Sequence, residues 1–281
     1  MSVKNELLRR FATLSPALQL VAKYVLDHPN EVVTGSMRTV GVRASAPPST
    51  LVRFAKHLGY EGWPQFKQAV AQEMGLGPEA YGNRARSLLG KANDKTLADE
   101  IFQVHHSNLD VTQRHSAVGL SKAAALLERA PSVHAAGFRA CFPIAFSFVY
   151  LYRLFRNTVH LIDGQGGSLE MQQRAMVKGD TLVIFSFAPY SREALQVAHA
   201  ATENGCKVVA VTDSVASPLA LVADATLLFG IQSPSFFPSI AAGMALTESL
   251  VELLASRAGA SVVERIERAE AQLFASGAYH A

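Results

Sequence analysis

The chain has 281 residues, of which 49% are hydrophobic and 17% are charged, which is enough for two packed domains and excludes an intrinsically disordered protein. The first 77 residues carry nine Lys or Arg and five Asp or Glu, an excess of four positive charges, whereas the whole chain carries only +3. The basic excess therefore lies at the N-terminal end, as expected where a domain binds DNA.

From its charged residues and short apolar runs we expect neither a signal peptide nor a membrane span. Glu6, Arg9 and Arg10 interrupt the start of the chain, and the longest apolar run, Phe142 to Leu154, is too short to span a bilayer. Two cysteines make neither a disulfide framework nor a metal cluster. We expect a cytoplasmic protein with no cofactor and no metal site.

The first clear helix begins at Pro16, which Ser15 can cap, and ends before residue 28. Its apolar stripe comprises Leu18, Val21, Ala22, Val25 and Leu26. A second helix is predicted over Met37 to Ala44, and only two or three residues separate it from the next. So short a connection indicates a sharp turn between two helices.

The segment from Pro48 to Leu58 has the pattern of a helix presented to the major groove of DNA. Pro48 suits the first helical position and Gly59 the position after the last turn. The apolar face comprises Leu51, Phe54, Ala55 and Leu58. The outer face, which we expect to contact DNA, comprises Ser49, Thr50, Arg53, Lys56 and His57.

These segments resemble the DNA-binding domain of the RpiR family of bacterial transcription regulators. The resemblance covers about Leu7 to Gly75 and rests on LSPALQLVAKYVLDHPNEVV and TLVRFAKHLGYEGWPQFKQAVAQEM. The chain departs from the family at Ser45-Ala46-Pro47, where Gly-Val-Ser is normal. We therefore expect proline rigidity, and not a serine cap, to fix the start of the DNA-contacting helix.

Glycine-rich sequence between residues 74 and 99 indicates a linker. We place a helix-turn-helix domain at 1–77, the linker at 78–95 and a second domain at 96–281. The second domain begins with a helix from about Thr96 to Gln113. His105 and His106 point to different faces of that helix, which favours packing over a metal site.

From Ser132 onward, short apolar runs alternate with helical segments. The predicted strands are VHAAG, VHLID, TLVIFS, KVVAVTD and ATLLFG, and the predicted helices lie at about 142–157, 168–177, 191–204 and 239–255. This alternation is typical of a doubly wound parallel sheet covered by helices on both faces. The predicted fold is thus an all-helical bundle joined to an α/β domain, whose ligand binds where the strand order reverses.

Three strand ends carry small or hydroxyl residues directly before a helix, whose N-terminal N–H groups favour an anion. They are residues 137–141, 186–191 and 212–214. This part resembles the SIS (sugar isomerase) domain over about Leu120 to Leu254, on the basis of FSFAPYSRE, NGCKVVAVTDSVASPLALVADATL and the long final helix. RpiR regulators combine the same two domains.

The loops also depart from the SIS pattern. Domains that bind phosphosugars typically show Ser-x-Ser-Gly-x-Thr, whereas this chain has Ser186-x-Ala188-Pro189-x-Ser191, which offers fewer hydrogen-bond donors. Arg139 stands where the first loop often has glycine. It can pair with a ligand's phosphate or carboxylate, or with Asp163 or Glu170 of the protein itself.

Two further residues are open to two interpretations each. Cys141, where the family often has serine, is either a low-pKa thiol at a helix N-terminus near Arg139 or a small buried residue. Glu248 lies where isomerising SIS enzymes keep an acid/base glutamate, although a helical glutamate is more often solvated. The expected ligand-binding residues are Arg139, Cys141, Ser186, Tyr190, Ser191, Thr212 and Ser214.

The sequence therefore predicts a DNA-binding transcription regulator, not an enzyme, whose operator affinity depends on a small anionic carbohydrate, either a phosphosugar or a sugar acid. One helix-turn-helix reads only a few base pairs, so we expect a homodimer or homotetramer on a palindromic double-stranded operator. Two alternatives are a DNA-binding protein whose SIS domain is only a dimerisation scaffold and a SIS sugar-phosphate isomerase or lyase.

Overall fold

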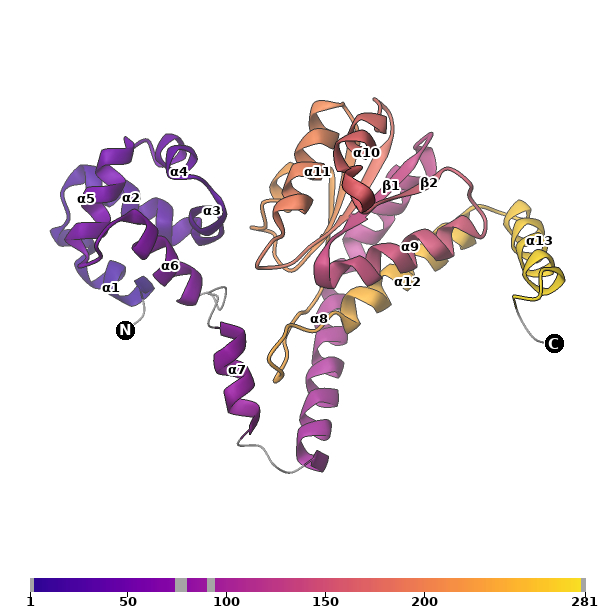
Figure 1. The fold of residues 1–281 in the computed structure, drawn as a ribbon, viewed down its shortest axis with the longest axis horizontal. Helices are drawn as coiled ribbons and strands as arrows, with labels where there is room; N and C mark the ends of the chain where they lie inside the picture. Colours follow the sequence, from indigo (N-terminus) through magenta and orange to yellow (C-terminus); the bar gives the residue numbers. More distant parts are fainter. Residues whose placement is uncertain (1–2, 74–79, 90–93, 279–281) are drawn as a thin grey trace. The chain divides into compact units, whose positions relative to one another are not determined.

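A computed structural model describes residues 3–73, 80–89 and 94–278 and divides the chain into two compact units (Figure 1). The first unit comprises residues 1–92 and Ser235–Phe237, and the second comprises Asn93–Pro234 and Pro238–Ala281. The first is helical and the second contains a five-stranded sheet.

The helices of the first unit are α1 (Val3–Arg10), α2 (Pro16–Asp27), α3 (Pro29–Thr34), α4 (Met37–Arg43), α5 (Pro48–His57), α6 (Trp63–Glu73) and α7 (Ala80–Leu89). Helices α1 to α6 enclose one apolar core, in which Leu51, Phe54 and Phe66 are completely buried. The rings of Phe54 and Phe66 meet edge to face with centroids 5.3 Å apart. The stripe predicted for α2 supplies Leu18, Val21 and Val25 to this core.

Two helices of this unit lie where the sequence predicted breaks. Pro29 was expected to end a helix, but it also starts α3, because proline is well suited to a first helical position. Helix α7 occupies much of the segment expected to be a linker without helices.

The second unit begins with the long helix α8 (Asp94–Arg129) and then alternates strands and helices. Its remaining elements are β1 (Val133–Gly137), α9 (Phe142–Arg153), β2 (Val159–Ile162), α10 (Leu169–Ala175), β3 (Thr181–Phe185), α11 (Arg192–Glu203), β4 (Lys207–Thr212), β5 (Ala225–Leu228), α12 (Ala241–Arg257) and α13 (Ser261–Ala275). All five predicted strands are present. Helix α13 was not predicted.

The five strands form one parallel sheet in the order β2-β1-β3-β4-β5. The chain leaves β1 toward one edge of the sheet, and later crosses to the other side with β3, so the strand order reverses between β1 and β3. In open sheets of this kind, ligands bind at that point, beyond the carboxyl ends of the strands. The loops after β1 and β3 flank it.

Helices cover both faces of the sheet, as Figure 1 shows. Helices α10 and α11 pack on one face, where Ile184, Val197 and Ala210 belong to one buried cluster. Helices α8, α9 and α12 lie on the other face, where α12 contacts both α8 and α9. The strands β1 and β3 are buried along their whole length, which accounts for their continuous apolar sequences.

Helix α8 continues to Arg129, well beyond the predicted end at Gln113. At 1.5 Å per residue its 36 residues span about 54 Å. Gly119 lies within it because a Cβ atom there would be only 2.6 Å from the carbonyl oxygen of Thr226 in β5. Close helix-to-strand packing, not a helix break, therefore explains this glycine.

None of the helices in the described part of the chain combines the length and apolar character needed to cross a bilayer.

Candidate operator-reading helix and ligand site

Helices α4 and α5 form the predicted helix-turn-helix. Ser36 caps α4, since its hydroxyl accepts a hydrogen bond from the Thr39 N–H at 3.1 Å. The turn is closed by the Ala46 N–H, which donates to the Gly41 carbonyl at 2.9 Å. Helix α5 starts at Pro48 with no side-chain cap, as expected from the missing serine.

Four of the five residues expected to contact DNA are exposed on α5: Ser49, Arg53, Lys56 and His57. The expectation that Thr50 faces outward is wrong, because Thr50 is only 7% exposed. It lies one residue before the completely buried Leu51, on the edge of the face that packs on the core. The exposed four leave a polar, basic surface on the second helix of the motif, the geometry through which such motifs read DNA.

At the carboxyl edge of the sheet, the loops after β1, β3 and β4 come together around Cys141, Tyr190 and Asp213. The Tyr190 hydroxyl donates to the Asp213 carboxylate over 2.8 Å. Cys141 interacts with the backbone of Phe187 and with the charge of Asp213. The order-reversal point of the sheet is therefore lined by side chains from all three predicted loops.

Asp213 is the residue of this edge that the sequence interpretation missed, although its neighbours Thr212 and Ser214 were named. Its carboxylate also accepts hydrogen bonds from the Ala188 N–H at 3.4 Å and from the Thr212 hydroxyl at 3.2 Å. A carboxylate directly after a parallel strand was the signal available, because the same strand-end rule applies to it. Burial, followed by the Asp213 charge and hydrogen bond, raises the pKa of the Tyr190 hydroxyl, which therefore stays protonated and donates.

The low-pKa interpretation of Cys141 is wrong. The residue is 3% exposed, and burial raises the pKa of its thiol to about 12, against the opposing hydrogen bond with the Phe187 backbone. The charge of Asp213 raises the pKa further. Desolvation disfavours the thiolate more than a helix N-terminus favours it, so Cys141 is an inert part of the site wall.

Arg139 has an internal partner, but neither of the two expected. Its guanidinium donates to the Glu193 carboxylate over 2.9 Å, while the Arg139 side chain remains 73% exposed. The other Glu193 oxygen is buried without a hydrogen-bond partner. Arg139 has a φ of 55°, in the left-handed region where the related SIS loops often have glycine.

The remaining predicted ligand residues differ in accessibility. Ser191 caps α11, because its hydroxyl accepts a hydrogen bond from the Ala194 N–H at 3.2 Å. Thr212 is completely buried and Ser186 is 4% exposed. Ser214 lies in a local turn in which its hydroxyl accepts from the Ala216 N–H. Direct ligand contact is thus most open to Arg139 and to the half-buried Asp213 and Ser214, whereas Tyr190 is only 8% exposed.

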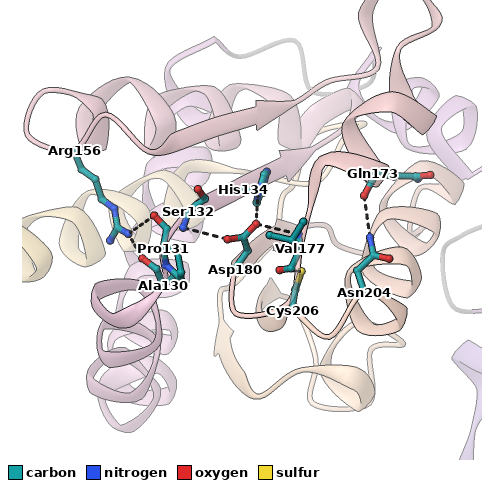
Figure 2. A network of polar contacts seen from close by, with 10 residues as sticks. All are labelled: Ala130, Pro131, Ser132, His134, Arg156, Gln173, Val177, Asp180, Asn204 and Cys206. Atoms are coloured by element: carbon teal, nitrogen blue, oxygen red, sulfur yellow. Dashed lines mark hydrogen bonds and ion pairs between the residues drawn. The ribbon is translucent and has the colours of Figure 1, made fainter.

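The opposite, amino edge of the sheet holds a separate buried network, shown in Figure 2. The Asp180 carboxylate, before β3, accepts hydrogen bonds from the backbone N–H groups of Ser132 and Val177 and lies 3.1 Å from His134 Nε2. The Cys206 thiol donates to the Val177 carbonyl at 3.2 Å. These bonds join the beginnings of three strands, and we assign them to stability because each buried polar group has a partner.

Arg156 extends this network to the end of α8 (Figure 2). Its guanidinium donates to the carbonyl of Leu127, in the last turn of that helix, and to the carbonyl of Ala130, directly after it. Unpaired carbonyls at a helix C-terminus favour such a cation.

The histidines of α8 do not form a metal site. His105 lies 3.3 Å from the Ser239 hydroxyl, and His106 is exposed. Among the described residues, no three His, Cys, Asp or Glu side chains are grouped so as to hold a metal ion. Glu248, the other candidate for chemistry, is exposed on α12.

Comparisons with known proteins match both parts of the chain. Residues 1–76 match the family model for the helix-turn-helix domain of the rpiR family, and residues 126–254 match that for the SIS domain. The chain is 27% identical to the HTH-type transcriptional regulator HexR of Pseudomonas aeruginosa over 216 residues, which are 75% of this chain and 73% of that protein. It is 24% identical to HexR of Escherichia coli K12, over 97% of this chain and 94% of that protein.

A solved structure extends the likeness to the fold of the whole chain. The Vibrio vulnificus NanR protein, complexed with ManNAc-6P, has a TM-score of 0.65 and 17% identity, covering 96% of this chain and 97% of that one. The helix-turn-helix and SIS matches follow one another along a chain that aligns with HexR over most of its length. The chain therefore combines a helix-turn-helix domain of the rpiR family with a SIS domain, and over most of its length it is similar to the transcription regulator HexR.

Proposed function

We propose that the protein binds an operator through α5 and that a small anionic carbohydrate at the carboxyl edge of its sheet changes the operator affinity. The observation that carries this proposal is the meeting of Cys141, Tyr190 and Asp213 at the order-reversal point of the sheet, in a chain that also contains a helix-turn-helix. NanR, which shares the fold, is complexed with ManNAc-6P, and this supports a carbohydrate ligand.

On the DNA side, Ser49, Arg53, Lys56 and His57 form the proposed reading surface, because all four are exposed on one helix. Arginine can bond two edges of a guanine, whereas lysine more often contacts phosphate. Thr50 belongs to the packing of α5 and not to this surface. Two copies of the chain would read a palindromic operator.

On the ligand side, Arg139 is the proposed partner for the anionic group. It is exposed and already pairs with a carboxylate, that of Glu193. An effector's carboxylate or phosphate can replace Glu193 in this pair, because guanidinium binds either group through parallel hydrogen bonds. Phosphosugars and sugar acids therefore remain equal candidates.

We further propose that the chain does not turn over its ligand. Its two HexR relatives are named as regulators. Glu248 is exposed on α12, and among the described residues no contact joins it to the three loops. We expect sugar phosphates incubated with the protein to remain unchanged, as measured by chromatography.

The test begins with selection of bound duplexes from genomic fragments, followed by fluorescence anisotropy with the purified full chain. ManNAc-6P, glucose 6-phosphate, gluconate and glucose are then added in turn. We expect at least one anionic probe to change the operator affinity by about 5- to 150-fold, the usual range for coupled sites. Arg139→Ala should abolish this change, and the matched control Arg153→Ala, an exposed arginine near the end of α9, should retain it.

Failure of every anionic probe to change operator binding would contradict the proposed effector. The SIS domain would then be a dimerisation scaffold. An Arg139→Ala protein that responds as the parent does would instead remove Arg139 from the site.

A further inference from the structure

The carboxylate of Asp213 accepts hydrogen bonds of the kind that a bound anion accepts. Three donors converge on it: the Tyr190 hydroxyl at 2.8 Å, the Thr212 hydroxyl at 3.2 Å and the Ala188 N–H at 3.4 Å. Hydroxyl and backbone N–H groups are the donors that a phosphate or carboxylate needs. In this chain they are already paired with a negative charge of the protein.

We propose that Asp213 determines the orientation of the effector: it binds the hydroxyl groups of a carbohydrate and excludes an anionic group from its side of the site. This inference rests on the proposed function. It adds a division of the site, in which Arg139 holds the anionic group and Asp213 holds the polyol part.

The hydrogen-bonding capacity of Asp213 supports the first half of this assignment. An ionised carboxylate has about four accepting positions and no donor. Tyr190 and Thr212 both bond to Oδ1, whereas Ala188 alone among the residues that the structure describes bonds to Oδ2. An accepting position is thus left on Oδ2, and a sugar hydroxyl, which donates, can use it.

The charges at the edge support the second half. Glu193 is a second carboxylate there, while Arg139 is the cation that pairs with it. A second anion beside Asp213 is repelled strongly, because the surrounding Cys141, Phe187 and Tyr190 are buried and screen charge poorly. Around Arg139, which is 73% exposed, an anion gains attraction instead. Asp213 would thus give specificity in two ways, by binding a hydroxyl group and by repelling an anionic group.

The decisive experiment measures binding of inorganic phosphate, the simplest anionic probe, to the full chain by calorimetry and by the shift in melting temperature. Asp213→Asn keeps the shape of the side chain and an acceptor oxygen for Tyr190, but removes the charge. We expect it to bind phosphate about tenfold or more tightly than the parent, because the negative charge that repels the probe is gone. The ratio of gluconate affinity to phosphate affinity should therefore be smaller in Asp213→Asn than in the parent.

Two control variants separate this effect from others. Asp224→Asn makes the same change at the beginning of β5, on the opposite edge of the sheet, where Asp224 pairs with Lys207 at 2.8 Å. Tyr190→Phe removes a donor but leaves the charge of Asp213. Neither should gain phosphate binding.

Phosphate binding by Asp213→Asn that is no tighter than that of Asp224→Asn would overturn the inference, as would an equal gain in Tyr190→Phe. Asp213→Ser, which also keeps an acceptor for Tyr190, gives the same comparison if the asparagine variant does not fold. These results are independent of DNA. If no carbohydrate probe changes the operator binding of the parent protein, the proposed function is contradicted. The phosphate comparison still tests the effect of the Asp213 charge in that case.

Discussion

Ser45 and Arg139 share a backbone conformation that residues with side chains rarely adopt. Their φ angles are 52° and 55°, and in both places the related families commonly have glycine. A left-handed conformation costs a residue with a Cβ atom about 1–2 kcal/mol. The chain therefore retains local strain in both of its functional loops, the turn before α5 and the loop after β1, where such strain is often found.

Replacing Ser45 with glycine should relieve this strain. We expect Ser45→Gly to stabilise the helix-turn-helix unit by about 0.5–1 kcal/mol, since the gain in the turn exceeds the added flexibility of the unfolded chain. Trp63, the single tryptophan, is 2% exposed in the core of this unit, so its fluorescence in a denaturant titration reports the change.

The matched control is Ser49→Gly, the same chemical change in the first turn of α5. It should give no gain, because glycine lowers helix stability. A Ser45→Gly protein that unfolds at a lower denaturant concentration than the parent would show that the Ser45 side chain stabilises the turn.

Arg53 is the residue whose removal should most reduce operator recognition. It is exposed on α5, and we expect Arg53→Ala to cost about 1–3 kcal/mol of specific binding and to relax the preference at one base position. Lys56→Ala should instead weaken binding to all duplexes alike and reduce the salt slope by about one unit. Anisotropy titrations on operator and scrambled duplexes at several salt concentrations distinguish the two. Full operator affinity in a folded Arg53→Ala protein would contradict the assignment.

At this scale, sequence patterns predicted residues of the candidate ligand site but not the pairing between their side chains. The strand-end rule led to Arg139, Tyr190 and Thr212, because it depends only on the order of elements. The pairing of Arg139 with Glu193, and of Tyr190 with Asp213, depends on side-chain directions across loops far apart in sequence. Periodicity carries no information about those directions.

At the scale of elements, burial decided which predictions succeeded. The five strands were predictable because most of their residues are buried, which requires continuous apolar runs. Helix α13 was missed, since Val262 is the one buried residue among those described in it, so its apolar residues do not contribute to the domain core. The extent of α8 was missed because Gly119 looks like a break until its contact with β5 is known.

A carboxylate joins three helices of the first unit and gives a test at this scale. Glu31, in α3, accepts hydrogen bonds from Tyr24 of α2 and from Arg43 of α4. Burial raises the pKa of Glu31, but these hydrogen bonds and the Arg43 charge outweigh it and hold the pKa below its ordinary value of 4.5. A group with a lowered folded pKa stabilises the fold above its unfolded pKa and ceases to do so as the pH falls through the folded value.

Glu31→Gln should therefore destabilise this unit by about 1–3 kcal/mol at neutral pH, because charge-assisted hydrogen bonds are lost. The difference from the parent should shrink as the pH is lowered below 4.5, where the parent's carboxylate becomes protonated too. Trp63 fluorescence during urea unfolding at several pH values measures it. Glu61→Gln, at an exposed turn residue, is the control, and a penalty for Glu31→Gln that does not change with pH would exclude the ionic contribution.

At the scale of the whole molecule, we expect the helix-turn-helix to act together with that of a second copy. A single motif reads too few base pairs for a specific site, so a two-fold dimer should bind half-sites about 34 Å apart. The final long helix and residues 101–111 are the two surfaces that we expect to join the copies. The first of them, on α12, is largely used within its own unit, where Leu246, Leu250 and Leu254 are buried. Residues 101–111 of α8 leave Phe102 63% exposed and Leu109 38% exposed.

We therefore expect light scattering to show a dimer or tetramer, and Phe102→Glu to weaken it about tenfold or more, since a symmetric contact places the charge twice in an apolar interface. Gln103→Glu adds the same charge at the next residue, on another face of α8, and should have little effect. Because two half-sites are bound together, loss of the dimer should also weaken operator binding. A strict monomer at micromolar concentration that still binds one specific site tightly would contradict this assembly, and a parent dimer unaffected by Phe102→Glu would place the interface elsewhere.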